Sequence, residues 1–375
     1  MRSICIISII AIQSIGWAQS SGSGTPSILK PLGKYRVGHT LIDWVDESRG
    51  EPGTQVASDH RKIPVEIWYP ADLGADAKPA SYRPRASSFR AVWGDESVAF
   101  FESVRTSWSE GAAVSSQGPF GMFVFSHGWG ARSSSHSTFL SNLASYGYIV
   151  VGINHPYLGM VALEDGTITE PNDSQFPSMV EANAFYAADV TCVIDRMLDL
   201  NTDDPKGLFT GTIDPERISA GGHSSGFPAV SGAVVKDARI KALISFDAGV
   251  PKSVRTHGLD VPILLFRADS NSYTDLFFRG PKVHPKGSIY DVSFFRVHRG
   301  DFYDLVISGT THSSVYDEYL FTDSVREQNL STRNHRIIER FAHEFLDLVL
   351  SKMTSDILAG AEHVEHTSLR IIPGD

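Results

Sequence analysis

Cysteine is scarce in this sequence, which has two cysteines in 375 residues. Cys5 lies in an N-terminal segment that we expect to be removed, which leaves Cys192 alone. A single cysteine can form no intramolecular disulfide and cannot supply a cysteine-based zinc site. His363 and His366 could pair on a metal only by coincidence. We therefore expect an enzyme or binding protein without a metal or other cofactor.

Positive charge and long apolar runs are also limited. Asp and Glu outnumber Lys and Arg by 43 to 33, which gives a formal net charge of −10 and argues against nucleic acid or an anionic surface as partner. Beyond the N-terminus, no stretch is long and apolar enough to span a bilayer. The charged fraction of 20% and the apolar fraction of 42% are typical of a globular enzyme, so a soluble protein is expected.

The first eighteen residues have the layout of a secretory signal peptide. Arg2 precedes an apolar run from Ile4 to Ile15, and the small residues Gly16 and Ala18 follow it. The run is short for a membrane span, so cleavage after Ala18 and secretion are predicted, with an N-terminal anchor as the alternative. Residues 19–34 are rich in Ser and Gly and are predicted to be a flexible leader.

Residues 35–355 alternate strand and helix patterns in the manner of one α/β domain. Two early strands, at 35–40 and 62–69, suit an antiparallel pair. A strand at 122–126, a helix at 139–146 and a strand at 148–153 predict a right-handed parallel crossover. We therefore expect a doubly wound, mostly parallel sheet with flanking helices, whose later strands lie at 218–220, 240–246, 261–266 and 304–308.

Two insertions, a long helix and two terminal elements complete the predicted domain. The segment 83–120 is expected to be irregular, with an amphipathic piece at 96–104. The segment 156–178 contains a hairpin-type turn at Glu164–Thr167. Residues 178–200 carry apolar residues at helical spacing and predict a helix. A closing helix is expected from about 334 to 353, and a polar, poorly ordered tail at 356–375.

The sequence Gly222-His223-Ser224-Ser225-Gly226 matches GxSxG. This pattern is typical of a sharp turn from a strand into a helix, with the serine held at its tip. The five letters alone are a weak signal, but an Asp-Pro turn at 214–217 and the strand at 218–220 precede them, and a small, apolar helix pattern at 227–235 follows. Ser224 is therefore the candidate nucleophile.

A serine nucleophile needs a base and an acidic residue that holds the base in the right tautomer. In sheets of this topology these partners follow the serine in the order acid, histidine, each just after a later strand. Asp247 follows the strand that ends at Phe246, and His312 follows the strand that ends near residue 308. Asp269, after the next strand, is the alternative acid, although it also suits a turn.

The other histidines fit structural roles better. His127 is interpreted as part of an oxyanion loop, and His223, inside the elbow, as a packed and hydrogen-bonded residue. Four more lie on insertions or loops far from the last strand: His136, His155, His284 and His298.

Two backbone N–H groups are candidates for stabilising the oxyanion that forms when the serine attacks a carbonyl. One belongs to Ser225, at the start of the elbow helix, and the other to Trp129, in the loop after the strand that ends at Ser126. Gly128 and Gly130 would let that loop approach closely. In comparable sites each such donor stabilises the transition state by roughly 3 kcal/mol.

Several segments together resemble the α/β-hydrolase superfamily and, more narrowly, the platelet-activating factor acetylhydrolase (plasma/isoform II) family with its bacterial relatives. The resemblance rests on IPVEIWYPA, SVRTSW, FSHGWGARSSSHSTFLSNLASYGYIVVGINHP, DPERISAGGHSSG, ISFDAG and ISGTTHSSV, between residues 35 and 316. It implies an α/β-hydrolase fold, a triad of Ser224, Asp247 and His312, and Trp129 and Ser225 as oxyanion donors.

The sequence departs from this family at the elbow. The family has an aromatic residue after the serine and a glycine after the second elbow glycine, where this chain has Ser225 and Phe227. The large side chain thus lies at position 227 instead of 225, which changes the shape expected for the acyl pocket. Trp129 and Phe227 are expected to contact the substrate. The resemblance implies a small-molecule or lipid ester as substrate.

The leading hypothesis is a secreted serine ester hydrolase that acts through an acyl-enzyme on short-chain acyl esters or phospholipid sn-2 esters. The alternatives are a polyester or cutinase-like hydrolase, a peptidase or thioesterase, and a non-catalytic scaffold. Trp93, Phe100 and Phe101 could form a lid or contact a lipid surface, or could pack on the core. The sequence does not determine the oligomeric state.

Overall fold

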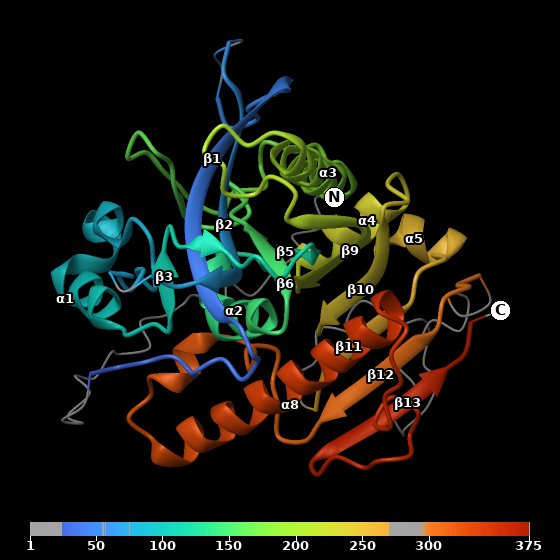
Figure 1. The fold of residues 1–375 in the computed structure, drawn as a ribbon. Coiled ribbons are helices and arrows are strands. Elements are labelled where there is room, and N and C mark those ends of the chain that lie inside the picture. The colour runs from blue at the N-terminus through green and yellow to red at the C-terminus, as the bar shows by residue number, and fades with distance from the viewer. Residues whose placement is uncertain are drawn as a thin grey trace, which may run out of the picture.

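The computed structural model describes residues 25–374 apart from 55, 57, 75, 270–293, 295 and 296. Within these residues, eleven strands form one sheet, which Figure 1 shows at the centre of the molecule. The strands are β1 (Arg36–Gly50), β2 (His60–Asp72), β3 (Trp108–Glu110), β4 (Ala113–Val114), β5 (Phe120–Ser126), β6 (Tyr148–Ile153), β9 (Ile213–His223), β10 (Ile240–Phe246), β11 (Ile263–Ala268), β12 (Phe302–Ile307) and β13 (Thr367–Ile372).

The sheet is parallel in its centre, and antiparallel pairs flank this centre on both sides, although the edge strand β3 pairs parallel with β1. The order is β13-β12-β11-β10-β9-β5-β6-β2-β1-β3, and β4 pairs with β2. All neighbours from β12 to β6 are parallel, whereas β2 pairs antiparallel with β6 and β1, and β13 pairs antiparallel with β12. The predicted doubly wound sheet with antiparallel N-terminal strands is therefore confirmed.

Helices cover both faces of the sheet. They are η1 (Ala86–Phe89), α1 (Arg90–Ser103), η2 (Ser133–His136), α2 (Ser137–Ser145), α3 (Met179–Thr202), α4 (Gly226–Val234), α5 (Lys252–His257), η3 (Asp317–Leu320) and α8 (Val325–Leu350). α3 and α4 pack into one core cluster, and α2 and α8 into the other. In Figure 1, α8 crosses in front of the sheet.

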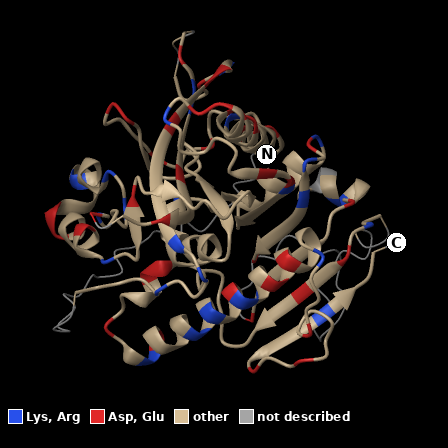
Figure 2. Cartoon of the chain, viewed as in Figure 1, with Lys and Arg blue, Asp and Glu red and all other residues tan. Residues whose placement is uncertain are grey.

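Strand β5 shows how the sequence produces this layered arrangement. Successive side chains of a strand point to opposite faces, so a strand covered on both sides must be apolar throughout. Met122 and Val124 belong to the core cluster under α3 and α4, whereas Phe123 and Phe125 belong to the cluster under α2 and α8. β5 and β6 carry no charged residue, while α8 carries both signs (Figure 2).

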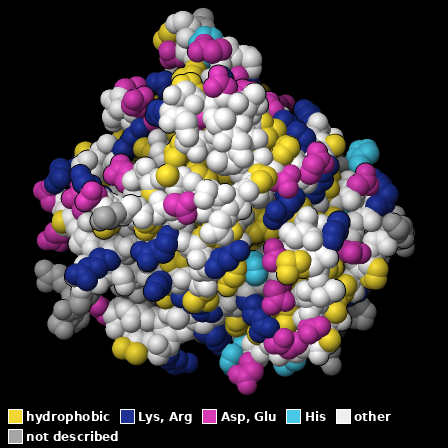
Figure 3. Space-filling view, viewed as in Figure 1, with side chains coloured by type: hydrophobic (Ala, Val, Ile, Leu, Met, Phe, Trp, Pro, Cys, Tyr) yellow, Lys and Arg dark blue, Asp and Glu magenta, His cyan; other side chains and the backbone are white. Residues whose placement is uncertain are grey.

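The surface mixes charges of both signs. On the face drawn in Figure 3, basic and acidic side chains are interleaved with apolar ones. Among the described residues, no helix is both long enough and apolar enough to cross a bilayer.

The C-terminal segment is more ordered than the sequence suggested. Instead of a poorly ordered tail, residues Thr367–Ile372 form β13, which pairs with the whole of β12. Leu369 and Ile371 alternate with more polar residues and pack against the core. This pairing satisfies backbone groups that β12 would otherwise expose at the sheet edge, which explains why a mostly polar tail is held.

The described part of the leader is also held on the domain. The N–H groups of Leu32 and Gly33 donate to Asn142 Oδ1 and Ser145 Oγ of α2, at 2.8 and 2.9 Å. Ile28 is buried. In the described part of the predicted leader, side chains of α2 thus satisfy two backbone N–H groups. The signal-peptide prediction for residues 1–18, and residues 19–24, lie outside the described residues.

The insertions contain regular elements. The amphipathic piece at 96–104 lies in α1, where Val98 and Phe101 are buried, so these aromatic and aliphatic side chains pack on the core. The turn at Glu164–Thr167 joins two short antiparallel strands, β7 (Val161–Ala162) and β8 (Ile168–Thr169), as expected. The closing helix α8 begins earlier than predicted, at Val325, because Ser324 Oγ caps it by accepting the Glu327 N–H at 3.3 Å.

Candidate active site

Ser224 lies in a sharp turn between β9 and α4. Its φ of 51° is in the left-handed region, which is strained for a residue other than glycine. The two elbow glycines are required by space. A Cβ on Gly222 would lie 2.6 Å from the backbone of Gly226, and a Cβ on Gly226 would lie 2.2 Å from Ser126 O. The GxSxG segment therefore forms the strand-turn-helix geometry that the sequence predicts.

Asp247 and His312 are in contact at the same edge of the sheet. Asp247 directly follows β10, and its Oδ2 accepts a hydrogen bond from His312 Nδ1 at 2.7 Å. The carboxylate is fixed from behind, because its Oδ1 accepts the Ala268 N–H at 3.1 Å. Since Nδ1 donates to the carboxylate, the neutral imidazole presents Nε2 as an acceptor. The His312 side chain is 12% exposed, so it lies at the rim rather than inside the core.

Asp269, the alternative acid, holds the loop that carries His312. Its Oδ2 accepts the Gly309 N–H at 2.9 Å, and its own N–H donates to Thr310 Oγ1 at 3.2 Å. The structure therefore pairs His312 with Asp247, while Asp269 anchors the start of the same loop.

His223 joins the serine turn to this loop. Its Nε2 donates to the backbone carbonyl of His312 at 3.0 Å, and the two imidazole rings lie 4.6 Å apart. The side chain is fully buried. Burial, and then the positive charge that His312 can carry, lower the pKa of His223 to about 3. His223 is thus the packed, hydrogen-bonded residue that was expected, and it brings the residue before Ser224 against His312.

The loop 127–130 lies beside the serine. A Cβ on Gly128 would lie 3.1 Å from Ser224 Cβ, so only glycine allows this approach. Gly130 has a φ of 75°, and its N–H donates to Leu158 O at 2.9 Å. Within the described residues, neither the Trp129 N–H nor the Ser225 N–H has a protein acceptor. Both donors are therefore free to bind an oxygen from outside the protein.

The two residues expected to contact substrate differ in position. The Trp129 side chain is 42% exposed beside Ser224. Phe227 is 1% exposed and belongs to the core cluster under α3 and α4, so the expectation that it contacts substrate is corrected. It lies in the first turn of α4, on the face that packs against the sheet, where an apolar side chain is buried.

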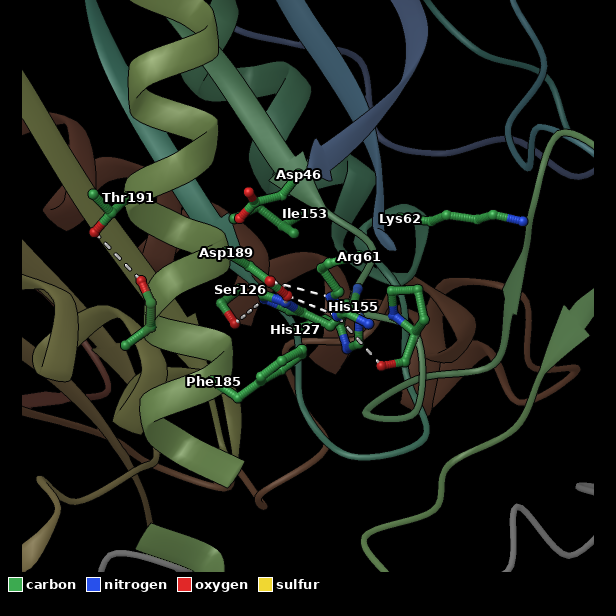
Figure 4. A network of polar contacts seen from close by, with 12 residues as sticks. Asp46, Arg61, Lys62, Ser126, His127, Ile153, His155, Phe185, Asp189 and Thr191 are labelled. Carbon is green, nitrogen blue, oxygen red and sulfur yellow. Dashed lines mark hydrogen bonds and ion pairs between the residues drawn. The ribbon is translucent and has the colours of Figure 1, made fainter. Parts of the chain in front are cut away.

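A buried polar cluster lies behind the loop (Figure 4), and the sequence analysis missed it. Asp189 of α3 accepts from Arg61 at 2.7 Å, from Arg49 at 2.7 Å and from His155 Nδ1 at 2.8 Å. His155 Nε2 accepts in turn from Ser126 Oγ at 2.9 Å. Asp189 interrupts the buried apolar face of α3, and that interruption is the signal that could have revealed the cluster.

Electrostatics explain how this cluster tolerates burial. Burial alone would raise the pKa of the Asp189 carboxyl, but Arg61 and His155 outweigh it, so the pKa lies well below its usual value. Burial lowers the pKa of His155, although Asp189 opposes the shift. The neighbouring His127 is also fully buried, and burial, followed by repulsion from His155, lowers its pKa to about 3. Both of these histidines are therefore neutral near pH 7.

One surface hollow lies away from the candidate active-site residues. A broad hollow follows α3, α4 and α5 and is lined by apolar residues such as Met179, Val235 and Leu259, but Ser224, Asp247 and His312 do not line it. No group of three or more His, Cys, Asp or Glu among the described residues could hold a metal ion.

The chain matches known proteins in both sequence and structure. A sequence model of the family described as platelet-activating factor acetylhydrolase, isoform II, matches residues 86–165, which include β5, the 127–130 loop and β6. A protein of Arthroderma benhamiae named probable 1-alkyl-2-acetylglycerophosphocholine esterase is 25% identical over 256 residues. That match covers 62% of this chain and 62% of the relative, so it spans less than two thirds of that protein's length.

A solved structure supports the architecture over nearly the whole chain. The ferulic acid esterase from Streptomyces cinnamoneus superposes with a TM-score of 0.73 and 22% sequence identity, covering 92% of this chain and 99% of that one. This chain has the α/β-hydrolase fold. The resemblance to the platelet-activating factor acetylhydrolase family is confirmed, with residues 86–165 matching its model.

Proposed function

We propose that this protein hydrolyses carboxylic esters through an acyl-enzyme formed on Ser224. The observation that carries the proposal is the 2.7 Å contact between His312 and Asp247 beside the serine turn. In this mechanism His312 Nε2 takes the proton from Ser224 Oγ as the oxygen attacks the ester carbonyl. Asp247 keeps the proton on Nδ1 and stabilises the imidazolium that forms.

The free N–H groups of Trp129 and Ser225 then receive the carbonyl oxygen as it becomes negative. Donors that are already oriented toward this oxygen need no reorganisation during the reaction, which makes them effective. His312 next gives its proton to the alcohol oxygen, which leaves as the acyl-enzyme forms. A water molecule, activated by the same imidazole, releases the acid and restores Ser224.

The substrate is proposed to be a short-chain acyl ester or a phospholipid sn-2 ester. The name of the Arthroderma relative supports this class, since it describes a probable esterase for an acetylated glycerophosphocholine. Trp129 is an exposed apolar residue in the loop whose Gly128 lies against Ser224, which suits contact with an acyl ester. We further propose that residues 1–18 are a signal peptide and that the enzyme acts after secretion.

Replacement of Ser224 tests the mechanism. We expect Ser224→Ala to lose p-nitrophenyl acetate and butyrate hydrolysis by at least about a thousandfold, because the nucleophile is gone. A fluorophosphonate probe should label the wild-type protein and not this variant. Ser219→Ala is the matched control, because Ser219 is a buried serine of the same strand whose hydroxyl donates only to Met122 O.

The outcomes separate the candidate functions. Ser224→Ala with most of its esterase activity, or a wild-type protein that neither turns over esters nor takes the label, would overturn the proposal. A panel of esters graded by acyl length, with a phosphocholine sn-2 ester and a polyester film, then identifies the substrate class.

A further inference from the structure

The buried cluster behind the 127–130 loop contains a chain of contacts that the proposed triad does not use. It begins at Asp189 on α3 and passes through His155 and His127 to the peptide between Gly128 and Trp129. In Figure 4, His155 and His127 lie side by side next to Asp189. Because Trp129 is a proposed oxyanion donor, the end of this chain lies at the reacting centre.

The first link fixes His155. Its Nδ1 donates to Asp189 Oδ2 at 2.8 Å, and its Nε2 accepts from Ser126 Oγ at 2.9 Å. Both ring nitrogens are therefore engaged, and the fully buried ring has no alternative partner in water. Arg61 Nη2 donates to the same carboxylate oxygen at 2.7 Å and so fixes Asp189. The backbone of His155 is consequently held at one position against the loop.

The second link fixes His127. The His155 N–H donates to His127 Nε2 at 3.1 Å, so this nitrogen carries no proton. The proton of the neutral ring is then on Nδ1, which donates to the carbonyl oxygen of Gly128 at 2.8 Å. A Cβ on Gly159 would lie 2.6 Å from His127 Cε1, so the segment after His155 also packs closely against this ring.

The third link is the geometry of the peptide bond itself. The Gly128 carbonyl and the Trp129 N–H belong to one trans peptide, so they point in opposite directions. A hydrogen bond that fixes the carbonyl therefore also fixes the direction of the N–H. The Ala131 N–H contributes a second bond to the same carbonyl, at 3.1 Å.

We propose that His127, held by the buried His155–Asp189 pair, is a positioning residue that aims the Trp129 N–H at the oxyanion. This inference rests on the proposed function and adds a residue that acts through the backbone of the loop. An imidazole is suited to the position because it donates from Nδ1 and accepts at Nε2 at the same time.

Two amide substitutions separate the two bonds of His127. In His127→Asn the side-chain amide can occupy the place of Nδ1 and donate to Gly128 O, but it cannot reach the His155 N–H. In His127→Gln the amide oxygen can occupy the place of Nε2 and accept from His155, but the bond to Gly128 is lost. We expect His127→Gln to lower kcat at least tenfold, with KM changed less than threefold, and His127→Asn to retain more turnover than His127→Gln.

The measurement is kcat and KM for p-nitrophenyl butyrate, normalised to the sites that a fluorophosphonate titrates, together with Tm for each variant. Titration removes unfolded protein from the comparison, so a merely structural role would lower the titrated fraction and Tm without lowering turnover per site. His298→Phe is the control, because it also removes a buried histidine but lies before the N-terminal end of β12, whereas His127 follows the C-terminal end of β5.

Turnover per site of His127→Gln within twofold of wild type, or higher than that of His127→Asn, would overturn the positioning role. If only one of the two variants folds, its kcat and its KM are each compared with the wild-type values. A loss that appears in KM alone contradicts the aiming of an oxyanion donor. Failure of the proposed function would instead appear as retained activity in Ser224→Ala.

Discussion

Two histidine–aspartate pairs in this protein have nearly the same geometry and different surroundings. The His312–Asp247 contact is 2.7 Å and the His155–Asp189 contact is 2.8 Å. The second pair even has a serine hydroxyl, that of Ser126, 2.9 Å from its other ring nitrogen. Ser, His and Asp in hydrogen-bonded order therefore occur near each other in this chain without necessarily forming a reactive site.

Access and neighbouring charge distinguish the two pairs. The His312 side chain is 12% exposed, whereas those of His155 and Asp189 are fully buried and out of reach of a substrate. Asp189 also neutralises Arg61 and Arg49, so its charge is committed to structure. Asp247 Oδ1 instead accepts the Ala268 N–H, and its Oδ2 contacts the imidazole of His312. In the proposed mechanism the rim pair acts on the substrate, whereas the interior pair holds the 127–130 loop in place.

The largest expected effect comes from Asp247→Asn. The asparagine keeps the shape of the side chain but can donate to His312 Nδ1, which would favour the wrong tautomer of the imidazole. We expect kcat to fall by roughly a thousandfold to ten-thousandfold, as for comparable triads, with a small change in Tm. The measurement is kcat/KM for p-nitrophenyl butyrate beside a melting curve. A loss of less than tenfold would mean that Asp247 does not orient the base.

The corresponding change in the interior pair, Asp189→Asn, should act on stability. It removes the charge that Arg61 and Arg49 share, which leaves the fully buried Arg61 with Glu51 as its acidic partner and Arg49 with Asp46, so the free energy of unfolding should fall by about 3 kcal/mol. Urea unfolding at pH 7 measures this change. Asp195→Asn is the control on the same helix, because Asp195 is largely exposed and pairs at the surface with Arg239, where the effect should stay below about 1 kcal/mol. Equal effects of the two substitutions would contradict the distinction drawn here.

The smallest expected effect is the response of the interior to acid. His127 and His223 have a pKa of about 3 in the folded protein, whereas an unfolded histidine titrates near about 6.5. Below about pH 6.5 the histidines of the unfolded chain take up protons that the folded chain does not. The free energy of unfolding is therefore highest above about pH 7 and falls as the pH falls. Each histidine should cost about 2 kcal/mol of unfolding free energy between pH 7 and pH 5.

Urea unfolding of wild type and His127→Asn at both pH values isolates this contribution. The variant has one buried histidine fewer, so its stability should fall less between pH 7 and pH 5. Equal pH dependence of the two proteins would contradict burial as the cause. Burial raises the pKa of Glu339 to about 7, so Glu339 makes the folded protein more stable as the pH falls. Both proteins contain Glu339, so its contribution cancels in the comparison.

Sequence reasoning reached the elements whose chemistry is local. Ser224 lies in a turn that two glycines specify, and Asp247 and His312 follow strands whose apolar runs are easily recognised. Because parallel strands end at one edge, their following residues converge without any knowledge of packing. In the structure, Ser224, Asp247 and His312 lie at this one edge of the sheet, as the strand order predicts.

The interior pair and the terminal segments could not be reached in this way. Arg61 in β2 and Asp189 in α3 are 128 positions apart, and they meet only in the folded protein. The strand β13 is a short apolar stretch in a mostly polar tail, and it pairs along the whole edge of β12. Phe227 was assigned to the substrate site from its place in the motif, but the helical turn directs it into the core.

The position of β13 also affects how the sheet is completed during synthesis. β13 lies C-terminal to every other strand in the sheet, so the ribosome makes it last. Until it emerges, the nascent protein presents β12 as an unprotected ladder that a second nascent chain could join. A fusion partner placed directly after β13 would leave β12 unpaired for longer only if it hindered the pairing of β13 with β12. Comparing the yield of soluble protein with a tag at the N-terminus and at the C-terminus therefore tests whether this last pairing limits folding.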